Sequence, residues 1–480
     1  MTELAALSLA RVGELIRDRE VSPVEVTTGV LERIDRLDGV VGAFVTVLAD
    51  RALRAARTAE REIAAGAYRG PLHGVPVSLK DLISTRGIRS TAGSASMADR
   101  VPDHDAAVVE RLDDAGAVVV GKAQTYEFAM GPGTVYPFGR TRNPWDLDRV
   151  TIGSSSGSAA GVCALMSYAS IGTDTGGSIR GPASGCGVVG FKPTYGRVSR
   201  YGVLPLSWTL DHVGPLTRDV LDAALVTRAI EGPDPRDRGT APMVPLDVAA
   251  IAAADLTGRR VGVPDAFFFD GVDPEFHAAF SVVVEQFTAA GATVVPITMP
   301  PIGDFQTVHS VILLAESYSI HEEHVRAHRD TVGPGVRDRM ALAASVTARD
   351  YLRAQRVRAV FAERFHHALA GVDVIATLTS PTVPHLFDQP PPSDHGAESR
   401  FGAQNRFRRI FSLTGAPAIS LPCGFTGAGL PIGLQLVGRP HRDQAVLEIA
   451  NAYQHITDWH LRRPSIPQTG AHPSTPAEGN

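Results

Sequence analysis

Two segments rich in serine and glycine could supply a nucleophile and a site for a developing negative charge. The first covers residues 153–158 and the second covers residues 172–180. Glycine lets a substrate approach the backbone closely, and successive N–H groups in such a loop can converge on one oxygen atom. Ser178 follows Gly176 and Gly177, so its hydroxyl could attack a carbonyl while its own N–H helps to bind the oxyanion. A serine in this role still needs a base.

Lys80 is the candidate base. Apolar Val75, Val77 and Leu79 alternate with other residues, which predicts a strand that carries Lys80 at its end. An ammonium group has no lone pair, so a lysine accepts a proton only where burial and hydrogen bonding lower its pKa. A lysine after a strand is more often a solvated residue, and the catalytic interpretation of Lys80 comes from the resemblance to a known family given next.

Taken together, these segments resemble the amidase signature family. The family has a lysine in a Gly-Val-Pro motif, then a serine and glycine cluster, then a Gly-Gly-Ser-Ile-Arg motif, and this chain has all of them in that order. The similarity covers roughly residues 70–220. Ile152 and Ser156 depart from the pattern, because the family has glycine at both positions.

The resemblance implies a relay in which a proton passes from Ser178 through Ser154 to Lys80, with Ser154 following a cis peptide bond. It also implies that N–H groups of one loop form the oxyanion hole, namely those of Thr175, Gly176, Gly177 and Ser178. Three further residues are expected to support this loop through hydrogen bonds or an ion pair: Ser155, Asp174 and Arg180.

Two other chemistries are less well supported. Ser155 is the centre of a Gly-x-Ser-x-Gly match to the nucleophile elbow of α/β-hydrolases, but residues 143–149 before it are turn-like and charged rather than a buried strand. His321, His324 and His328 fall on one helix face, but their spacing is not His-Glu-x-x-His, and a solvated or pocket-lining face is the simpler interpretation. We expect no metal and no cofactor.

The composition is that of an ordinary globular protein. Of the 480 residues, 44% are hydrophobic and 20% are charged, with a formal net charge of −5. There is no basic run, so we expect a small amide substrate and water as partners, and neither a nucleic acid nor a membrane. The N-terminus lacks the basic region of a signal peptide, which favours a cytoplasmic protein. Cys163, Cys186 and Cys423 are too widely spaced to indicate a disulfide framework or a metal site.

Strand and helix patterns alternate along most of the chain, which predicts an α/β fold. The pattern alone permits two domains divided near residues 231–237. The resemblance instead implies one α/β/α sandwich around a mixed central β-sheet. We therefore expect a single domain over residues 1–463, with its signature core at about 70–220, peripheral helices at 8–65 and 300–410, and a flexible tail at 464–480.

The C-terminal half of the chain bears on the choice of substrate. Several segments look like the A subunit of the tRNA-dependent amidotransferase, which takes glutamine with an arginine and an aspartate. Arg358 falls at the arginine position, but Asn405 replaces the aspartate, which removes the partner of a glutamine ammonium group. Residues 457–464 look more like stand-alone amidases. The predicted pocket residues are Phe128, Met130, Gly131, Arg358 and Asn405.

We therefore predict an independent serine hydrolase that cleaves the C–N bond of a small amide, a class that includes carbamates, hydrazides and aryl amides. The glutamine-hydrolysing A subunit of an amidotransferase is the alternative. A binding protein on an inactive amidase scaffold is a third hypothesis, which the intact Lys80, Ser154 and Ser178 argue against. A homodimer is an expectation from the family alone.

Overall fold

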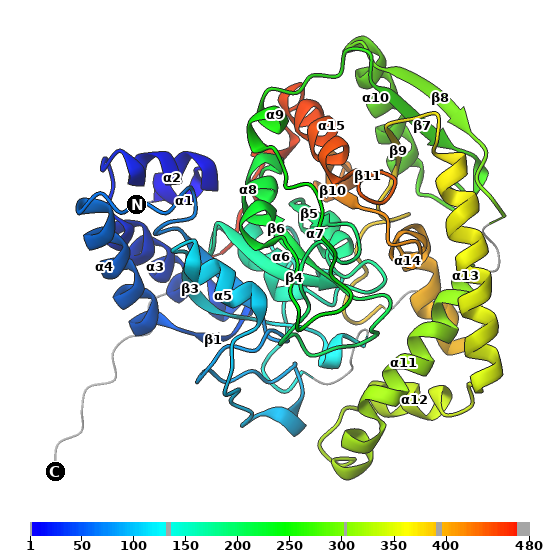
Figure 1. Cartoon of the computed structure of the whole chain (residues 1–480), viewed down its shortest axis with the longest axis horizontal. Helices are drawn as coiled ribbons and strands as arrows, with labels where there is room; N and C mark the ends of the chain where they lie inside the picture. The colour runs from blue at the N-terminus through cyan, green and yellow to red at the C-terminus, as the bar shows by residue number, and fades with distance from the viewer. Residues whose placement is uncertain (1, 131–135, 302–304, 390–395, 468–480) are drawn as a thin grey trace.

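The computed structural model describes residues 2–130, 136–301, 305–389 and 396–467. Their centre is one mixed sheet of eleven strands, which crosses Figure 1 from lower left to upper right. In spatial order the strands are β1 (Phe44–Val47), β3 (Val118–Ala123), β2 (Pro76–Lys80), β4 (Ala169–Asp174), β6 (His212–Thr217), β5 (Val189–Lys192), β10 (Ala418–Phe425), β11 (Pro431–Val437), β9 (Val374–Leu378), β7 (Arg260–Pro264) and β8 (Thr293–Ile297).

The sheet mixes both strand directions. Strand β2 runs parallel to its neighbours β3 and β4, and β7 runs parallel to β8 and β9. Between these two parallel groups, β6, β5, β10 and β11 pair antiparallel with their neighbours. The prediction of an α/β fold with a mixed central sheet is confirmed. The polar turn at residues 231–237 does not divide this sheet, because strands from both sides of it belong to the same sheet.

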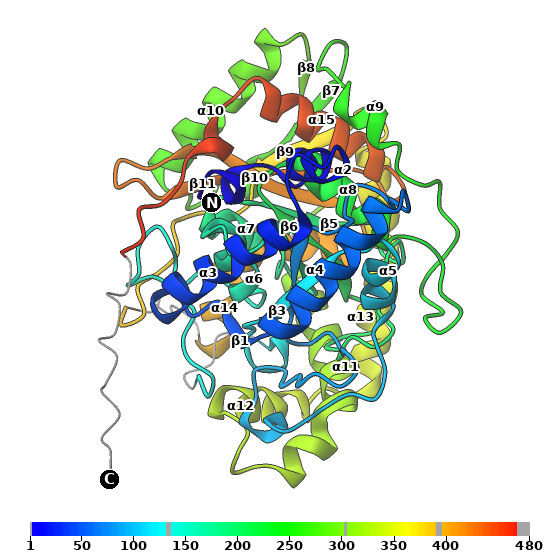
Figure 2. The ribbon, with the colours of Figure 1, turned by 90° about the vertical axis from the view of Figure 1, so that its left-hand side faces the viewer.

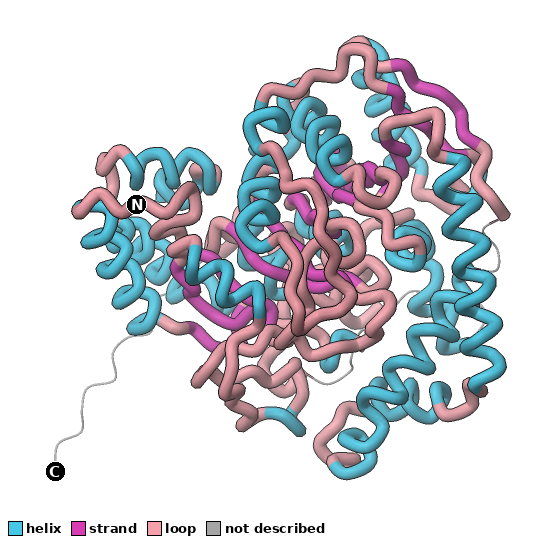
Figure 3. Tube along the Cα trace, viewed as in Figure 1, coloured by secondary structure: helices cyan, strands magenta, loops and turns pink. Residues whose placement is uncertain are grey.

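Helices cover the sheet, and further helices lie beyond both of its ends, as Figure 3 shows. Four lie near the β1 end, where Figure 2 shows α3 and α4 in front of the sheet: α1 (Thr2–Ala6), α2 (Leu9–Arg17), α3 (Pro23–Val41) and α4 (Ala49–Ala64). A second group lies on the right of Figure 1: α11 (Phe305–Ala327), α12 (Pro334–Ala343), α13 (Ala348–Ala368) and α14 (Gly396–Leu413). The rest are α5 (Ala107–Asp114), α6 (Ser156–Cys163), α7 (Arg180–Cys186), α8 (Val220–Ile230), α9 (Val248–Ala252), α10 (Pro274–Ala289) and α15 (Asp443–His455).

The start of α3 shows how local sequence sets an element. The Ser22 hydroxyl accepts a hydrogen bond from the backbone N–H of Glu25 at 3.0 Å, and Pro23 stands where its missing N–H costs nothing. Gly42 ends the helix in the left-handed conformation, at φ 65°. The buried face includes the apolar positions that the sequence places at helical spacing: Val26, Val30, Ile34 and Leu37.

Strand β2 is buried along its whole length, because it lies between two other strands and beneath helices. Four strands were not recognised from sequence patterns: β4, β5, β6 and β11. Strand β4 reads Ala-Ser-Ile-Gly-Thr-Asp, so it lacks the apolar alternation that marks a half-buried strand. Within the described residues no helix is long and apolar enough to cross a bilayer. Most of the tail expected at residues 464–480 lies outside the described residues.

Candidate active site

Lys80 meets two hydroxyl groups in the interior of the protein. Its side-chain nitrogen lies 2.8 Å from Ser154 Oγ and 2.7 Å from Thr173 Oγ1. Strand β2 delivers the lysine at its last residue, and the neighbouring strand β4 delivers Thr173. Lys80 has no solvent exposure. The predicted contact between Lys80 and Ser154 is therefore present, and a second contact, to Thr173, accompanies it.

Burial changes the acid–base behaviour of this lysine. Removal from water lowers the pKa of Lys80 to about 7, although the negative charges of Asp174 and Asp211 act in the opposite direction. A substantial fraction of the side chain is then a neutral amine near neutral pH. A neutral amine has the lone pair that a general base requires.

The Gly153–Ser154 peptide bond is cis. The backbone N–H of Tyr126 donates to the carbonyl of Ser154 at 3.2 Å. A Cβ atom on Gly153 would lie 2.3 Å from the Tyr126 ring, so only glycine fits at this position without displacing the ring.

Ile152 lies just before this bond with φ 60°, a left-handed conformation that is strained for a β-branched residue. Glycine is the residue that tolerates this conformation, which gives a physical reason for the glycine expected there by resemblance. The Ile152 side chain is buried, and its Cγ2 atom lies 3.0 Å from where a Cβ on Gly181 would be. The departure from the family pattern is therefore accommodated by packing against α7.

Ser155 connects the two serine segments. Its backbone N–H donates to the carbonyl of Ser178 at 3.2 Å, and its hydroxyl donates to the carbonyl of Thr173 at 3.2 Å. The hydroxyl also accepts from the Thr173 N–H at 3.3 Å. Ser155 is completely buried. A buried hydroxyl that is engaged in this way suits a supporting residue better than the exposed nucleophile of an elbow motif.

Ser178 is partly exposed, unlike most of the loop around it. Its hydroxyl makes no hydrogen bond with any residue that the structure describes. Lys80 thus contacts Ser154 directly. Ser178 is connected to the segment that carries Ser154 through the hydrogen bond between its carbonyl and the Ser155 N–H.

Asp174 organises the loop that carries Ser178. Its carboxylate accepts from the backbone N–H of Gly177 at 2.7 Å and of Ile179 at 3.2 Å, and it pairs with Arg180 at 2.9 Å. Burial by itself would raise the pKa of Asp174, but the Arg180 guanidinium and other nearby cations hold it well below its ordinary value. The Asp174 carboxylate is therefore ionised at neutral pH.

The loop leaves three backbone donors available. Within the part of the chain that the structure describes, the N–H groups of Thr175, Gly176 and Ser178 make no hydrogen bond. The Gly177 N–H, by contrast, is occupied by Asp174. Gly177 has φ 117°, a conformation that favours glycine. The four predicted oxyanion donors are thus reduced to three in this structure.

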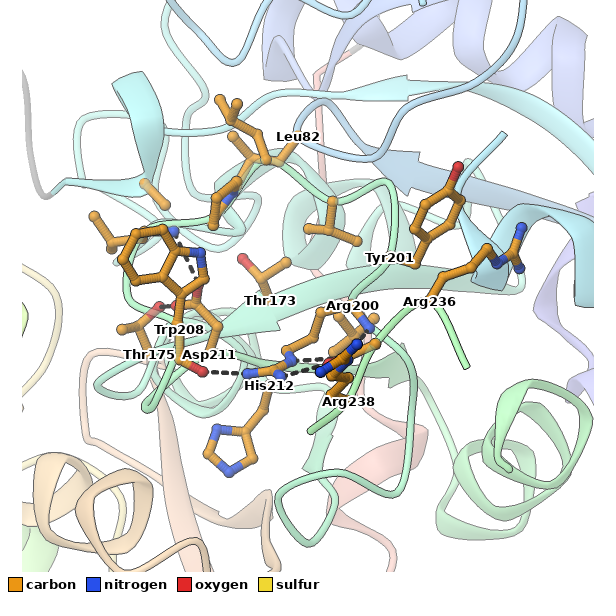
Figure 4. Close-up of a pocket in the computed structure, with 17 residues that line it drawn as sticks. Leu82, Thr173, Thr175, Arg200, Tyr201, Trp208, Asp211, His212, Arg236 and Arg238 are labelled. Atoms are coloured by element: carbon orange, nitrogen blue, oxygen red, sulfur yellow. Dashed lines mark hydrogen bonds and ion pairs between the residues drawn. The ribbon is translucent and has the colours of Figure 1, made fainter. Parts of the chain in front are cut away.

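A cavity of about 250 Å³ opens beside this loop, bounded on one side by Thr173 and Thr175 (Figure 4). The exposed ring of Trp208 and three arginines surround it: Arg200, Arg236 and Arg238. Arg200 is paired with Asp237 at 2.7 Å. On the wall near the loop, Asp211 accepts from the Thr175 hydroxyl at 2.6 Å. Asp211 lies outside the recognised motifs, so no local sequence signal indicated its role.

The residues expected to bind substrate have varied surroundings. Phe128 and Met130 are buried in a small apolar cluster, and the Phe128 ring lies 5.1 Å from that of His321. Gly131 lies outside the described residues. The Arg358 guanidinium is engaged by the carbonyls of Leu413 at 2.7 Å and Thr209 at 2.8 Å.

Asn405 accepts a hydrogen bond from Arg408. Arg408 is completely buried, and its Nε atom lies 2.5 Å from where a Cβ on Gly177 would be.

The histidines of α11 have separate partners. His321 Nε2 contacts the carbonyl of Pro205 at 2.8 Å, and His324 Nε2 contacts the hydroxyl of Ser96 at 2.9 Å. Another histidine of this helix, His309, was not singled out from the sequence. Its Nε2 atom lies 3.0 Å from the carbonyl oxygen of Thr175, in the loop that carries Ser178.

Comparison with known proteins gives a consistent relationship. The model of the Amidase family matches residues 25–447. The A subunit of the glutamyl-tRNA(Gln) amidotransferase of Geobacter metallireducens is 40% identical, over 97% of this chain and 100% of the relative. The protein of the same name from Moorella thermoacetica is 39% identical, over 97% of this chain and 99% of the relative.

Solved structures agree with this relationship. A structure described as "An unexpected vestigial protein complex reveals the evolutionary origins of an s-triazine catabolic enzyme" superimposes with a TM-score of 0.88 at 31% identity, covering 96% of this chain and 100% of that chain. The A subunit of the glutamyl-tRNA(Gln) amidotransferase from Thermotoga maritima superimposes with a TM-score of 0.82 at 32% identity, covering 97% of this chain and 98% of that chain.

Two sequence-based predictions are wrong in the light of these relatives. The independent hydrolase of a small amide was favoured because of Asn405 and residues 457–464, but the similarity to amidotransferase subunits extends over 97% of the chain. The absence of a nucleic-acid partner was inferred from a net charge of −5, yet the names of these relatives include a tRNA. Net charge bears only on direct electrostatic attraction, and says nothing of an association made through other subunits.

Proposed function

Since this chain belongs to the amidase family, we propose that it is the glutamine-hydrolysing subunit of a glutamyl-tRNA(Gln) amidotransferase. In this function it works with partner subunits and a charged tRNA. The observation that carries the proposal is the identity of about 40% along almost the entire chain to proteins of that name.

The proposed reaction starts at Ser178. Its hydroxyl oxygen attacks the side-chain carbonyl carbon of glutamine, while its proton passes through the Ser154 hydroxyl to the neutral amine of Lys80. The short contact between Lys80 and Ser154, at 2.8 Å, and the pKa of Lys80 of about 7 support the lysine as the base.

The tetrahedral intermediate places a negative charge on the former carbonyl oxygen. The unengaged N–H groups of Thr175, Gly176 and Ser178 are suited to bind it, and removal of one such donor typically costs a factor of about 10²–10³ in kcat. The protonated relay then returns a proton to the leaving nitrogen, so that ammonia departs and a glutamyl ester remains on Ser178. Water, activated by the same relay, hydrolyses the ester and releases glutamate.

The position of Asn405 makes the proposal open to a direct test. A carboxylate is expected at this position in a glutamine-binding subunit, and Asn405 instead contacts Arg408. If the chain nevertheless takes glutamine, other groups must hold the ammonium group of the substrate. The assay must therefore be made with the complete complex as well as with the isolated chain.

The test is glutamate release from glutamine by the purified chain, alone and together with the partner subunits of the same organism and glutamyl-tRNA(Gln). We expect hydrolysis that the partners and the charged tRNA stimulate, and that Ser178→Ala abolishes without loss of the fold. Formation of glutaminyl-tRNA should depend on the same serine. An enzyme that has no glutaminase activity in the complete complex, with Ser178 reactive, would contradict the proposal.

A further inference from the structure

His309 joins the outer helical layer to the catalytic loop. It lies on α11, is 1% exposed, and its Nε2 atom is 3.0 Å from the carbonyl oxygen of Thr175. A carbonyl oxygen only accepts hydrogen bonds, so Nε2 must carry the proton in this contact. The other ring nitrogen, Nδ1, has no partner among the described residues. A neutral imidazole that donates from Nε2 satisfies this arrangement.

The contact acts at a particular peptide unit. In a trans peptide the carbonyl of one residue and the N–H of the next point in opposite directions. A hydrogen bond that holds the Thr175 carbonyl against His309 therefore also fixes the direction of the Gly176 N–H. That N–H is one of the three donors of this loop that make no hydrogen bond within the described residues.

The loop is held on its other side as well. The Thr175 hydroxyl donates to Asp211 at 2.6 Å, and the Gly177 N–H donates to Asp174 at 2.7 Å. The His309 ring also packs directly on the loop, because a Cβ on Gly176 would lie 3.0 Å from its Cε1 atom. Asp211 and Asp174 thus bind the residues on either side of Gly176. His309 is the contact that orients the peptide unit between Thr175 and Gly176.

We infer that His309 is a positioning residue for the oxyanion hole, which directs the Gly176 N–H toward the carbonyl that Ser178 attacks. The inference rests on the proposed assignment of Ser178 as the nucleophile. It assigns to α11, far from the serine segments in the sequence, a role in the chemistry.

The hydrogen bond from His309 to the Thr175 carbonyl does not depend on pH in the range in which the enzyme would act. Burial, together with the positive charge of Arg409, lowers the pKa of His309 to about 3. The ring therefore stays neutral at every pH at which Lys80 can act as a base. A change of pH in that range alters the relay and leaves the His309 contact intact.

The test uses a fluorophosphonate, which reacts with the nucleophile whatever the natural substrate is. The Ser178 oxygen forms a bond to phosphorus, the P–F bond breaks, fluoride leaves, and the serine proton passes to the relay. The phosphoryl oxygen must enter the oxyanion hole in this step. The measurement is the second-order rate constant of Ser178 labelling in the full chain, with the labelled peptide identified by mass spectrometry.

Two substitutions separate the hydrogen bond from the packing. We expect His309→Phe, which keeps a ring and removes the donor, to lower the labelling rate by a factor of about 10–100. His309→Gln, whose amide can donate to the same carbonyl, should stay within about threefold of the wild type. His328→Phe changes an exposed histidine just beyond the C-terminal end of α11, and should label at the wild-type rate. Melting temperatures of all variants report whether the fold persists.

Three results would overturn the inference. The first is wild-type labelling by a folded His309→Phe variant, and the second is an equal loss in the phenylalanine and glutamine variants. The third is a wild-type chain in which Ser178 is not labelled, which would also contradict its assignment as the nucleophile. Failure of tRNA-dependent glutamine hydrolysis with normal labelling would count against the proposed function alone.

Discussion

The Thr173 hydroxyl contacts the amine of Lys80 at 2.7 Å, as closely as the predicted relay residue does. The two residues come from neighbouring strands, β4 and β2, which run parallel and pair directly. Thr173 immediately precedes Asp174 in β4, so their side chains point to opposite faces of the sheet. Thr173 contacts Lys80, and Asp174 pairs with Arg180. The candidate base therefore has a second hydroxyl partner, Thr173, which is neither the predicted nucleophile nor the predicted relay residue.

Replacement of Thr173 by valine should alter the base without changing the packing volume much. The threonine oxygen accepts a hydrogen bond from the charged amine, so its loss favours the neutral form and should lower the pKa of Lys80 by about one unit. We expect the acid limb of the labelling rate to move to lower pH accordingly. Thr173→Ser retains the hydroxyl and should keep the wild-type profile; an unchanged profile in the valine variant would show that the contact does not influence the base.

The activity of the wild-type chain should rise with pH through about 7. Below that pH Lys80 is an ammonium ion that cannot accept a proton, and above it the amine is neutral, in line with a pKa lowered to about 7 by burial. The measurement is the rate of Ser178 labelling between pH 5 and pH 10, in steps of about one unit.

The matched control for this profile is Lys80→Arg, because the arginine stays protonated over the whole range. It should be inactive at every pH. A midpoint of the wild-type profile near the ordinary value of lysine would contradict the role given to burial.

Loss of the Asp174 carboxylate should destabilise the fold strongly. Asp174→Asn leaves Arg180 as a buried charge without its partner, a change that typically costs about 3–5 kcal/mol in the free energy of unfolding. Urea unfolding followed by circular dichroism measures it. The control is Glu14→Gln, which breaks an ion pair with Arg11 whose side chains are about half exposed and should cost less than about 1 kcal/mol. Equal effects of the two substitutions would refute the structural importance of the buried pair.

Asn405→Asp should stabilise the chain. Arg408 is fully buried, and burial together with repulsion from Arg180 lowers its pKa to about 9. A carboxylate at position 405, where the amide oxygen already accepts from this guanidinium, would give it a charged partner. We expect the free energy of unfolding to increase by about 1–2 kcal/mol. Asn405→Ala removes the acceptor and should decrease the free energy of unfolding. A destabilised aspartate variant would mean that burying the new carboxylate costs more free energy than its interaction with Arg408 supplies.

Gly177→Ala should be much more costly than the same change at another glycine with positive φ. At Gly177 the added Cβ meets both a strained backbone, at φ 117°, and the Arg408 side chain at 2.5 Å. We expect a loss of about 2–4 kcal/mol in stability. Gly66 has φ 84° and open space around it, so Gly66→Ala measures the backbone strain alone, at about 1 kcal/mol. Similar losses at both sites would indicate that the loop yields to the new side chain.

Part of the candidate site could be anticipated because its residues stand in short contiguous motifs that resemble the amidase family. The strand that ends at Lys80 and the loop from Asp174 to Arg180 follow from local spacing and from the conformational freedom of glycine. The ion pair of Asp174 with Arg180 joins residues only one loop apart. When two residues are close in the sequence, the short chain between them allows few relative positions of their side chains.

The errors concern groups that long-range packing brings together. Of the four strands that were missed, β4 and β6 contain glycine and polar residues and are buried by the neighbouring strands on both sides. The Gly177 N–H was assigned to the oxyanion hole because sequence position cannot show that Asp174 already occupies it.

The amino-acid sequence by itself determined which residue types stand at the site and the α/β class of the fold, since both are written in local patterns. Only the tertiary structure decided that the Thr173 hydroxyl contacts Lys80 across two neighbouring strands, and that Asp211 and His309 contact Thr175 in the loop from a distant turn and from the outer helical layer. The physical reason is that a hydrogen bond depends on distance and direction in space, and the folded sheet sets these between residues that the chain keeps far apart.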